Sequence, residues 1–270
     1  MRVPFIKMHG LGNDFIVIDA RGTVVPAMTA GFAAALADRK TGIGCDQLIL
    51  LEPSDRATVR MRIFNADGSE VGACGNATRA IGLLLGGKAS IETLAGLLHT
   101  DAQDSGIAVD MGEPNFEWDR IPLAYAMDTL TMPVGWDELE NPCAVNVGNP
   151  HAVFFVSDNC TIDLERLGPL IEHDPLFPER VNVNVATVTS RQHIRLRVWE
   201  RGVGETRACG TGACATALAA MRRGLVEREV EVELPGGTLT IGWGADNRVT
   251  MTGPAATSFR GEFDPADYGA

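Results

Sequence analysis

The sequence repeats one pattern at a distance of half its length. The segment VRMRIFNADGSEVGAC, residues 59–74, aligns with IRLRVWERGVGETRAC, residues 194–209, so that each position is matched 135 residues later in a chain of 270. Apolar and basic residues alternate at the start of both copies, as in a half-buried strand. A Cys-Gly pair and an apolar segment ending at glycine follow, as expected of a helix. The repeat therefore predicts two similar α/β halves.

A second, shorter match supports this repeat. Gly12-Asn13 corresponds to Gly148-Asn149, and a strongly apolar strand is expected after each pair, at 15–18 and 152–156. Alternating and isolated strands elsewhere favour antiparallel or mixed sheets over a doubly wound parallel sheet. These strands are expected at 107–111, 183–188, 229–233 and 239–241. The predicted fold class is thus α/β (α+β), with two pseudo-symmetric halves.

A Pro-rich, polar segment at 112–122 is the natural boundary between the halves. We expect an N-terminal half at 1–115, which carries Cys74, and a C-terminal half at 116–256, which carries Cys209. Residues 257–270 have no counterpart at the end of the first half, and they are candidates to pack back onto it.

Charge and motif content exclude several functions. A formal net charge of −12 argues against a nucleic-acid partner, which needs a basic face. No apolar run approaches the length of a membrane span, and the N-terminus lacks a secretory apolar core, so we expect a cytoplasmic protein without a membrane partner. Six cysteines are too few for a disulfide scaffold. The sequence has no CxxC or HxxxH pair for zinc, and no glycine-rich cradle for a nucleotide cofactor.

Cys74 and Cys209 each lie directly ahead of an expected helix. The first N–H groups and the positive dipole end of a helix favour an anion. That anion can be a thiolate, or a substrate carboxylate held by the amides of residues 75–76 and 210–211. Two such thiols on either side of a bound carbon could remove a proton from one face and return one to the other. Amide donors would stabilise the intermediate carbanion, and the reaction would invert a stereocentre.

Other interpretations of these residues stay open. A cysteine in an Ala/Gly-rich segment is usually a small buried hydrophobe, which is the preferred interpretation of the remaining four: Cys45, Cys143, Cys160 and Cys214. The two candidate thiols could instead form a redox disulfide. The glycines beside them could serve turns alone, and His9 and His151 could be structural.

Six ordered motifs resemble those of the diaminopimelate epimerase family across nearly the whole chain. They are KMHGLGNDFIVID (7–19), GIGCDQLILLE (42–52), FNADGSEVGACGNATR (64–79), GNPHAVFFV (148–156), RVNVNVA (180–186) and ERGVGETRACGTGA (200–213). The resemblance implies an isomerase that converts LL-2,6-diaminopimelate to the meso isomer, without cofactor or metal, in lysine and peptidoglycan precursor synthesis. It also implies that each half is a rolled β-sheet around a central helix, and that the protein is a homodimer.

The same resemblance assigns roles to individual residues. It makes Cys74 and Cys209 the catalytic thiolate/thiol pair, and it makes His151 and Glu200 the groups that adjust their ionisation. The substrate contacts that it implies are Asn13, Gln47, Asn65, Gly75, Asn76, Asn149, Asn182, Glu200, Arg201, Gly210 and Thr211. An arginine fork suits a carboxylate, and a glutamate can accept from an ammonium group. Ala77 stands where several family members have glycine, but this change removes no backbone donor.

Two further functions are compatible with the two cysteines. One is a related cofactor-independent racemase that acts on proline, hydroxyproline or histidine. The other is a non-catalytic amino-acid-binding or redox-sensing protein that uses the thiols as a disulfide switch. Arg201 favours a substrate with a second carboxylate, since a monocarboxylate would leave that guanidinium without a partner.

Overall fold

A computed structural model describes residues 2–269. Its contacts divide the chain into unit 1, which holds the residues up to 109 and from 253 onward, and unit 2, which holds residues 110–252. The sequence-based boundaries at 115/116 and 256/257 differ from these by a few residues. No helix within residues 2–269 is long and apolar enough to span a bilayer.

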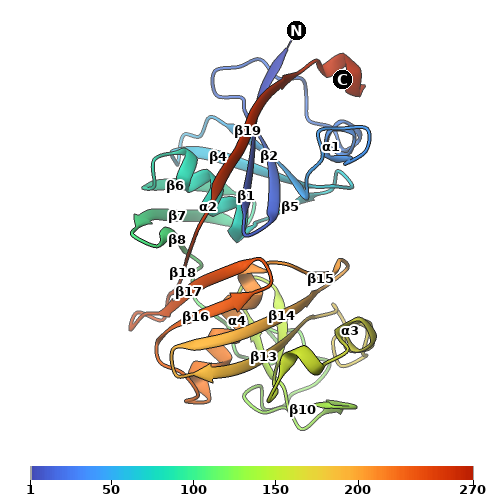
Figure 1. Cartoon of the computed structure of the whole chain (residues 1–270), viewed down its shortest axis with the longest axis vertical. Helices are drawn as coiled ribbons and strands as arrows, with labels where there is room; N and C mark the ends of the chain where they lie inside the picture. Colours follow the sequence, from blue (N-terminus) through green and yellow to red (C-terminus); the bar gives the residue numbers. More distant parts are fainter. Residues whose placement is uncertain (1, 270) are drawn as a thin grey trace. The chain divides into compact units, whose positions relative to one another are not determined.

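Unit 1 is a mixed sheet with two helices. Its sheet runs in the order β19-β1-β2-β3-β4-β6-β7-β8, with the short β5 beside β4. The C-terminal strand β19, red in Figure 1, is antiparallel to the N-terminal strand β1, in blue. The elements are β1 (Val3–Gly10), β2 (Asn13–Asp19), α1 (Ala30–Ala37), β3 (Gln47–Glu52), β4 (Val59–Asn65), β5 (Glu70–Val71), α2 (Gly75–Leu84), β6 (Ala89–Thr93), β7 (Gly96–Gln103), β8 (Gly106–Asp110), β19 (Ala256–Phe263) and the 3-10 helix η2 (Pro265–Tyr268).

Unit 2 repeats this arrangement. Its sheet runs β11-β12-β13-β14-β16-β17-β18, with β15 beside β14 and a small β9–β10 hairpin apart from it. The elements are β9 (Gly135–Trp136), β10 (Leu139–Glu140), β11 (Cys143–Asn146), β12 (Pro150–Phe155), the 3-10 helix η1 (Asn159–Thr161), α3 (Leu164–Glu172), β13 (Asn182–Ser190), β14 (His193–Glu200), β15 (Gly204–Thr206), α4 (Gly210–Arg222), β16 (Glu229–Leu234), β17 (Gly237–Trp243) and β18 (Val249–Gly253).

The strand directions match between the two units. The pairs β1–β2 and β11–β12 are antiparallel, β2–β3 and β12–β13 are parallel, and β3–β4 and β13–β14 are antiparallel. The next pairs, β4–β6 and β14–β16, are parallel and enclose the helices α2 and α4 in the chain. This agreement confirms the predicted fold class of two pseudo-symmetric halves with mixed sheets.

The helices α2 and α4 are the centres of their units. In unit 1, α2 contacts both β1 and β7, which lie far apart in the strand order, so the sheet curves around the helix. In unit 2, α4 contacts strands from β11 through β17. Every residue from Gly212 to Ala220 is buried. Because most of these side chains are small, the strands can approach the helix closely.

The strand β2 shows why apolar and polar residues do not alternate in the interior strands of the sheet. Phe15 and Val17 pack in the cluster around α2, whereas Ile16 and Ile18 pack in the cluster around α1. Successive side chains of a strand point to opposite faces, so a strand covered on both faces is apolar throughout. The apolar run of this strand therefore reflects two covered faces of one sheet.

One expectation about the cysteines was wrong. Cys45, Cys143 and Cys214 are buried as predicted, but Cys160 is exposed. Cys160 lies in η1, a short turn that directs its neighbour Asn159 inward instead, where the amide donates to the carbonyls of Val185 and Arg195. Burial raises the pKa of Cys45 to about 12 and that of Cys143 to about 11, so both stay thiols at neutral pH.

Two glycines of unit 1 with the same backbone conformation allow a matched stability test. Gly68 and Gly86 have φ of +84° and +87°. A Cβ at Gly68 would lie 2.0 Å from the carbonyl oxygen of Ala30, whereas a Cβ at Gly86 would have no neighbour within 4 Å. We expect Gly86→Ala to lower the free energy of unfolding by about 1–2 kcal/mol through left-handed strain alone, and Gly68→Ala by about 2–5 kcal/mol. Urea unfolding measures both, and equal losses would contradict the packing explanation.

Candidate active site

Each central helix begins at a cysteine. Cys74 is the N-cap of α2, and its Sγ accepts a hydrogen bond of 3.4 Å from the backbone N–H of Ala77. Cys209 is the N-cap of α4, and its Sγ accepts one of 3.3 Å from the N–H of Gly212. Both cysteines have extended backbone dihedral angles, as N-cap residues do. Sulfur thus takes the place of the usual capping oxygen, where the helix dipole favours a negative charge.

Asn13 lies beside Cys74 in unit 1. Its Oδ1 accepts a hydrogen bond of 3.1 Å from Asn76 Nδ2 and lies 3.9 Å from Cys74 Sγ. Its Nδ2 donates to Asp46 Oδ2 over 3.0 Å, which fixes the direction of the amide. The first turn of α2 and the start of β2 therefore meet at the Cys74 sulfur.

A group of charged residues holds this asparagine in place. Arg39 bridges Asp46 and Asp14, with N–O distances of 2.7 Å and 2.5 Å, and Lys7 pairs with Asp14. Burial alone would raise the pKa of Asp14, but the hydrogen bonds from Arg39 and Lys7 lower it well below its usual range. The Asp14 carboxylate therefore stays charged, which keeps this support intact at neutral pH.

Gln47 and Asn65 lie at the same edge of unit 1. The parallel strands β2 and β3 begin at this edge, and the antiparallel β4 ends there, so Gln47 stands opposite Asn65. Gln47 Nε2 donates to Asn65 Oδ1 over 3.1 Å. Asn65 Nδ2 in turn donates to Ser69 Oγ over 3.2 Å, in the turn that leads toward α2.

Glu200 is the charged neighbour of Cys209 in unit 2. It ends β14, and its Oε1 accepts a hydrogen bond of 2.5 Å from Thr206 Oγ1. Cys209 is only 4% exposed, and its Sγ lies 3.5 Å from Thr211 Oγ1. Burial first, and then the negative charge of Glu200, raise the pKa of Cys209 well above its ordinary value. The surroundings of this sulfur thus favour the protonated thiol.

His151 lies in the interior of unit 2 and has no exposed surface. Its Nδ1 is 3.1 Å from Asn184 Oδ1, and its Nε2 is 3.0 Å from Asn149 Oδ1. Burial lowers the pKa of His151 to about 4; the hydrogen bond with Asn184 opposes this shift, and the charge of Arg201 adds to it. The ring is therefore neutral at neutral pH.

Asn182 and Arg201 meet at the end of β14. Asn182 Oδ1 accepts from the Arg201 backbone N–H over 2.9 Å, and its Nδ2 donates to the Pro150 carbonyl over 2.8 Å. The buried Glu172 of α3 supports the same loop, because its carboxylate accepts from the Gly202 N–H. The Arg201 guanidinium is exposed and donates to the Glu179 carbonyl over 2.8 Å.

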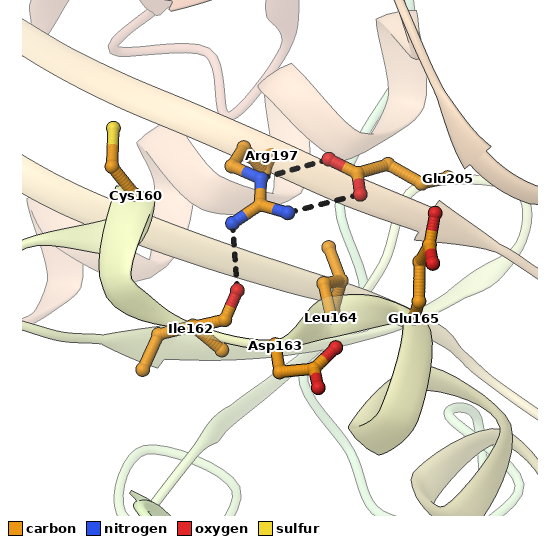
Figure 2. Close-up of a pocket in the computed structure, with 7 residues that line it drawn as sticks. All are labelled: Cys160, Ile162, Asp163, Leu164, Glu165, Arg197 and Glu205. Atoms are coloured by element: carbon orange, nitrogen blue, oxygen red, sulfur yellow. Dashed lines mark hydrogen bonds and ion pairs between the residues drawn. The ribbon is translucent and has the colours of Figure 1, made fainter.

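A pocket of about 340 Å³ lies elsewhere in unit 2. Figure 2 shows Arg197 in the middle of its wall, joined to Glu205 by two hydrogen bonds of 2.8 and 3.0 Å and to the Ile162 carbonyl by a third. The other lining residues are Cys160, Asp163, Leu164 and Glu165. None of the predicted site residues lines this pocket, and its guanidinium already binds a carboxylate.

Contacts join the predicted residues in small groups, which are Asn13 with Cys74 and Asn76, Gln47 with Asn65, Asn149 with His151, Asn182 with Arg201, and Cys209 with Glu200 and Thr211. Unit 1 holds Asn13, Gln47, Asn65, Cys74, Gly75 and Asn76, and unit 2 holds Asn149, His151, Asn182, Glu200, Arg201, Cys209, Gly210 and Thr211. The sequence analysis missed Asp46 and Asn184. The signal for Asn184 was a second asparagine two residues after Asn182 in the apolar strand NVNVA, and that for Asp46 was its position directly before a strand that begins with Gln47. Among residues 2–269 there is no cluster of three His, Cys, Asp or Glu side chains that could hold a metal.

The chain matches the family profile described as diaminopimelate epimerase over residues 5–117 and 143–258. A protein of Erythrobacter litoralis named diaminopimelate epimerase is 66% identical to it, over 99% of this chain and 100% of that protein. A protein of the same name from Zymomonas mobilis is 55% identical, over 99% and 100%.

Solved structures share the fold at low sequence identity. A phenazine biosynthesis protein of the PhzF family from Bacillus anthracis has a TM-score of 0.70 and 18% identity, over 98% of this chain and 99% of that one. A probable proline racemase from Agrobacterium radiobacter has a TM-score of 0.68 and 16% identity, over 99% and 96%. The profile match and the full-length identities, on the duplicated frame with its two cysteine-capped helices, show that this chain belongs to the diaminopimelate epimerase family.

Proposed function

We propose that this chain interconverts LL-2,6-diaminopimelate and its meso isomer, with Cys74 and Cys209 as the two acid–base groups. One thiolate removes the proton from the α-carbon, and the other group, as a thiol, returns a proton to the opposite face. The observation that carries the proposal is the equivalent placement of the two sulfurs, each of which caps the central helix of its unit and accepts a backbone N–H. The full-length relatives that are named diaminopimelate epimerase support the choice of substrate.

The helix mouths suit the reacting end of the substrate. The backbone amides of residues 75–76 and 210–211 are the first N–H groups of α2 and α4, where a carboxylate binds well. As the proton leaves, negative charge moves from the α-carbon onto this carboxylate. The same donors then bind more strongly, which lowers the barrier. The scheme needs no cofactor.

Polar side chains around the two helix mouths bind the remainder of the substrate in this proposal. Diaminopimelate carries an ammonium and a carboxylate at each end, so donors and acceptors are both required. Arg201 would bind the distal carboxylate, and Glu200 would accept from an ammonium group. The other proposed contacts are Asn13, Gln47, Asn65, Asn76, Asn149 and Asn182.

Cys209 begins the catalytic cycle as the protonated thiol in this scheme. Its burial and the charge of Glu200 both favour the thiol. His151, held neutral by burial, adds no positive charge that would favour a thiolate nearby. We therefore assign the adjustment of the Cys209 thiol to Glu200, and the resemblance implies a role of this kind for His151.

The reaction needs both sulfurs at one carbon. We therefore propose that the two halves close over the substrate, and that the polar segment between them, residues 112–122, acts as the hinge. Closure would also exclude water, which competes for the carbanion.

A cytoplasmic location, which the sequence predicts, and a homodimeric state, which the resemblance implies, complete the proposal. Cell fractionation tests the first, and sedimentation of the purified chain tests the second.

Removal of either thiol tests the two-base assignment. We expect Cys74→Ala and Cys209→Ala each to lower kcat for epimerisation by about 10²–10⁴-fold, because each removes one proton-transfer group. Cys160→Ala is the matched control, since it removes an exposed thiol that lies outside the proposed site. The assay follows the meso isomer formed from LL-diaminopimelate, together with deuterium entering the α-carbon in deuterated water, and proline and histidine are run in parallel. Full turnover by either alanine variant would remove the assignment, and exchange on proline alone would favour the racemase alternative.

The charge of Glu200 provides a pH test. The folded-state pKa of Cys209 is raised, partly by this carboxylate, so Glu200→Gln favours the thiolate and lowers that pKa. In a Cys74→Ala background, the rate at which iodoacetamide alkylates Cys209 should reach half its maximum at a lower pH in the Gln variant than in the parent. Peptide mass spectrometry separates this thiol from the others. An unchanged or higher midpoint would show that Glu200 does not act on the sulfur.

A further inference from the structure

A chain of buried polar groups crosses the interior of unit 2. Asn184 of β13 and His151 of β12 have no exposed surface. Asn184 Nδ2 lies 2.9 Å from both the Gly212 carbonyl oxygen and Thr216 Oγ1 of α4. Its Oδ1 faces His151 Nδ1 over 3.1 Å, and His151 Nε2 is 3.0 Å from Asn149 Oδ1. The chain thus links the first turns of α4 to Asn149, a proposed substrate contact.

In unit 1, the three positions equivalent to His151, Asn184 and Thr216 are apolar. His151 stands opposite the first residue of β13 as Phe15 stands opposite the first residue of β3. Asn184 is the third residue of β13 as Ile49 is the third residue of β3. Thr216 is the seventh residue of α4 as Ile81 is the seventh residue of α2. The side chains of unit 1 at these positions are Phe15, Ile49 and Ile81, all without exposed surface and all in one apolar cluster. The frame therefore packs without polar groups here, and unit 2 retains groups whose burial is unfavourable unless each is hydrogen-bonded.

The donors and acceptors in this series of polar groups fix the direction of each hydrogen bond. A carbonyl oxygen only accepts, so Asn184 must turn its amide nitrogen toward Gly212 and its oxygen toward His151. His151 Nδ1 must then carry a proton. Because the buried ring is neutral, it has only this one proton, and Nε2 is an acceptor.

The orientation of the Asn149 amide follows from the protonation state of the His151 ring. An unprotonated Nε2 and an amide oxygen would repel each other, since both only accept. A half-turn of the amide exchanges its oxygen and nitrogen at nearly the same positions and makes the contact a hydrogen bond. The equivalent Asn13 of unit 1 has the same arrangement, because its nitrogen donates to Asp46 and its oxygen is left to accept.

We propose that Asn184 is a positioning residue, which acts through His151 to turn the Asn149 amide so that its carbonyl oxygen faces the substrate. This inference rests on the proposed function. An amide oxygen suits an ammonium group, which has three donors and no acceptor, and it rejects a carboxylate. Asn149 thereby selects an ammonium group, and not a carboxylate, of the diamino dicarboxylate.

The tautomer of His151 is the first test, and it needs no activity. Long-range ¹H–¹⁵N correlation of the histidine-labelled full chain at neutral pH should show a proton on Nδ1 and none on Nε2. His151→Gln identifies the signal among the five histidines. Thr216→Val is the control, because it removes one acceptor of Asn184 and keeps the Gly212 carbonyl, so the tautomer should not change. A proton on Nε2 of the unsubstituted chain overturns the proposal, whatever the outcome of the exchange assay.

The second test reverses the hydrogen bond between His151 and Asn149. Asn184→Asp places a carboxylate at Nδ1, which raises the pKa of His151 and favours a doubly protonated ring. Nε2 then donates, the Asn149 oxygen turns to it, and the amide nitrogen faces the substrate. We expect KM for LL-diaminopimelate to rise about tenfold or more, as for the loss of a hydrogen bond to a charged group.

Rescue separates this role from a purely structural one. In the Asn184→Asp background, Asn149→Asp provides an oxygen on both sides, one for the protonated ring and one for the ammonium group. KM should then return toward its original value. A rise in the pKa of His151 without a rise in KM, or a raised KM that the second substitution leaves unchanged, overturns the proposal.

Discussion

A backbone N–H donated to a cysteine sulfur is the contact on which the remainder of the site depends. It exists because the chain turns from a short strand into a buried helix at Cys74 and again at Cys209. An oxygen at either position would cap the helix as well, but it would not ionise near neutral pH. In the proposed mechanism, each cysteine therefore combines a structural role at the helix end with acid–base chemistry. In the same proposal, the glycines directly after the two cysteines let a ligand approach the first N–H groups of both helices.

The duplicated frame places equivalent groups in both units but does not make them identical. Glu200 ends β14 where Asn65 ends β4, so one sulfur has a charged neighbour and the other has a neutral amide at the matching position. Asn13 and Asn149 are likewise equivalent, yet a carboxylate orients the first and a neutral imidazole contacts the second. Each difference lies at the end of a strand, where a substitution changes the site and leaves the sheet pairing intact.

The duplicated strand–loop–helix unit could be predicted because its sequence pattern is local and occurs twice. Alternation over residues 59–63 and 194–198, followed by Cys-Gly and an apolar segment, identifies strand, loop and helix without tertiary information. The contact between Asp46 and Asn13 could not be predicted, since it needs the parallel pairing of β2 with β3. Asn184 lies in a strand covered on both faces, so alternation did not show which face it occupies. Cys160 was misjudged because a single 3-10 turn decides whether it or Asn159 points inward.

In the proposed mechanism, the unequal surroundings of the two sulfurs affect the protonation state of the enzyme after each turnover. In a two-thiol epimerisation, the product leaves with the proton on the sulfur that began without one. The free enzyme therefore exists in two forms, and each form accepts only one configuration of the reacting carbon. Because burial and the charge of Glu200 disfavour a thiolate at Cys209, the form with that thiolate is the less stable one. It returns to the resting form when Cys209 takes a proton from water and Cys74 releases its own proton to water. In the proposed mechanism, a duplicated frame thus supports a catalytic cycle in which the two sulfurs spend unequal times as thiolates.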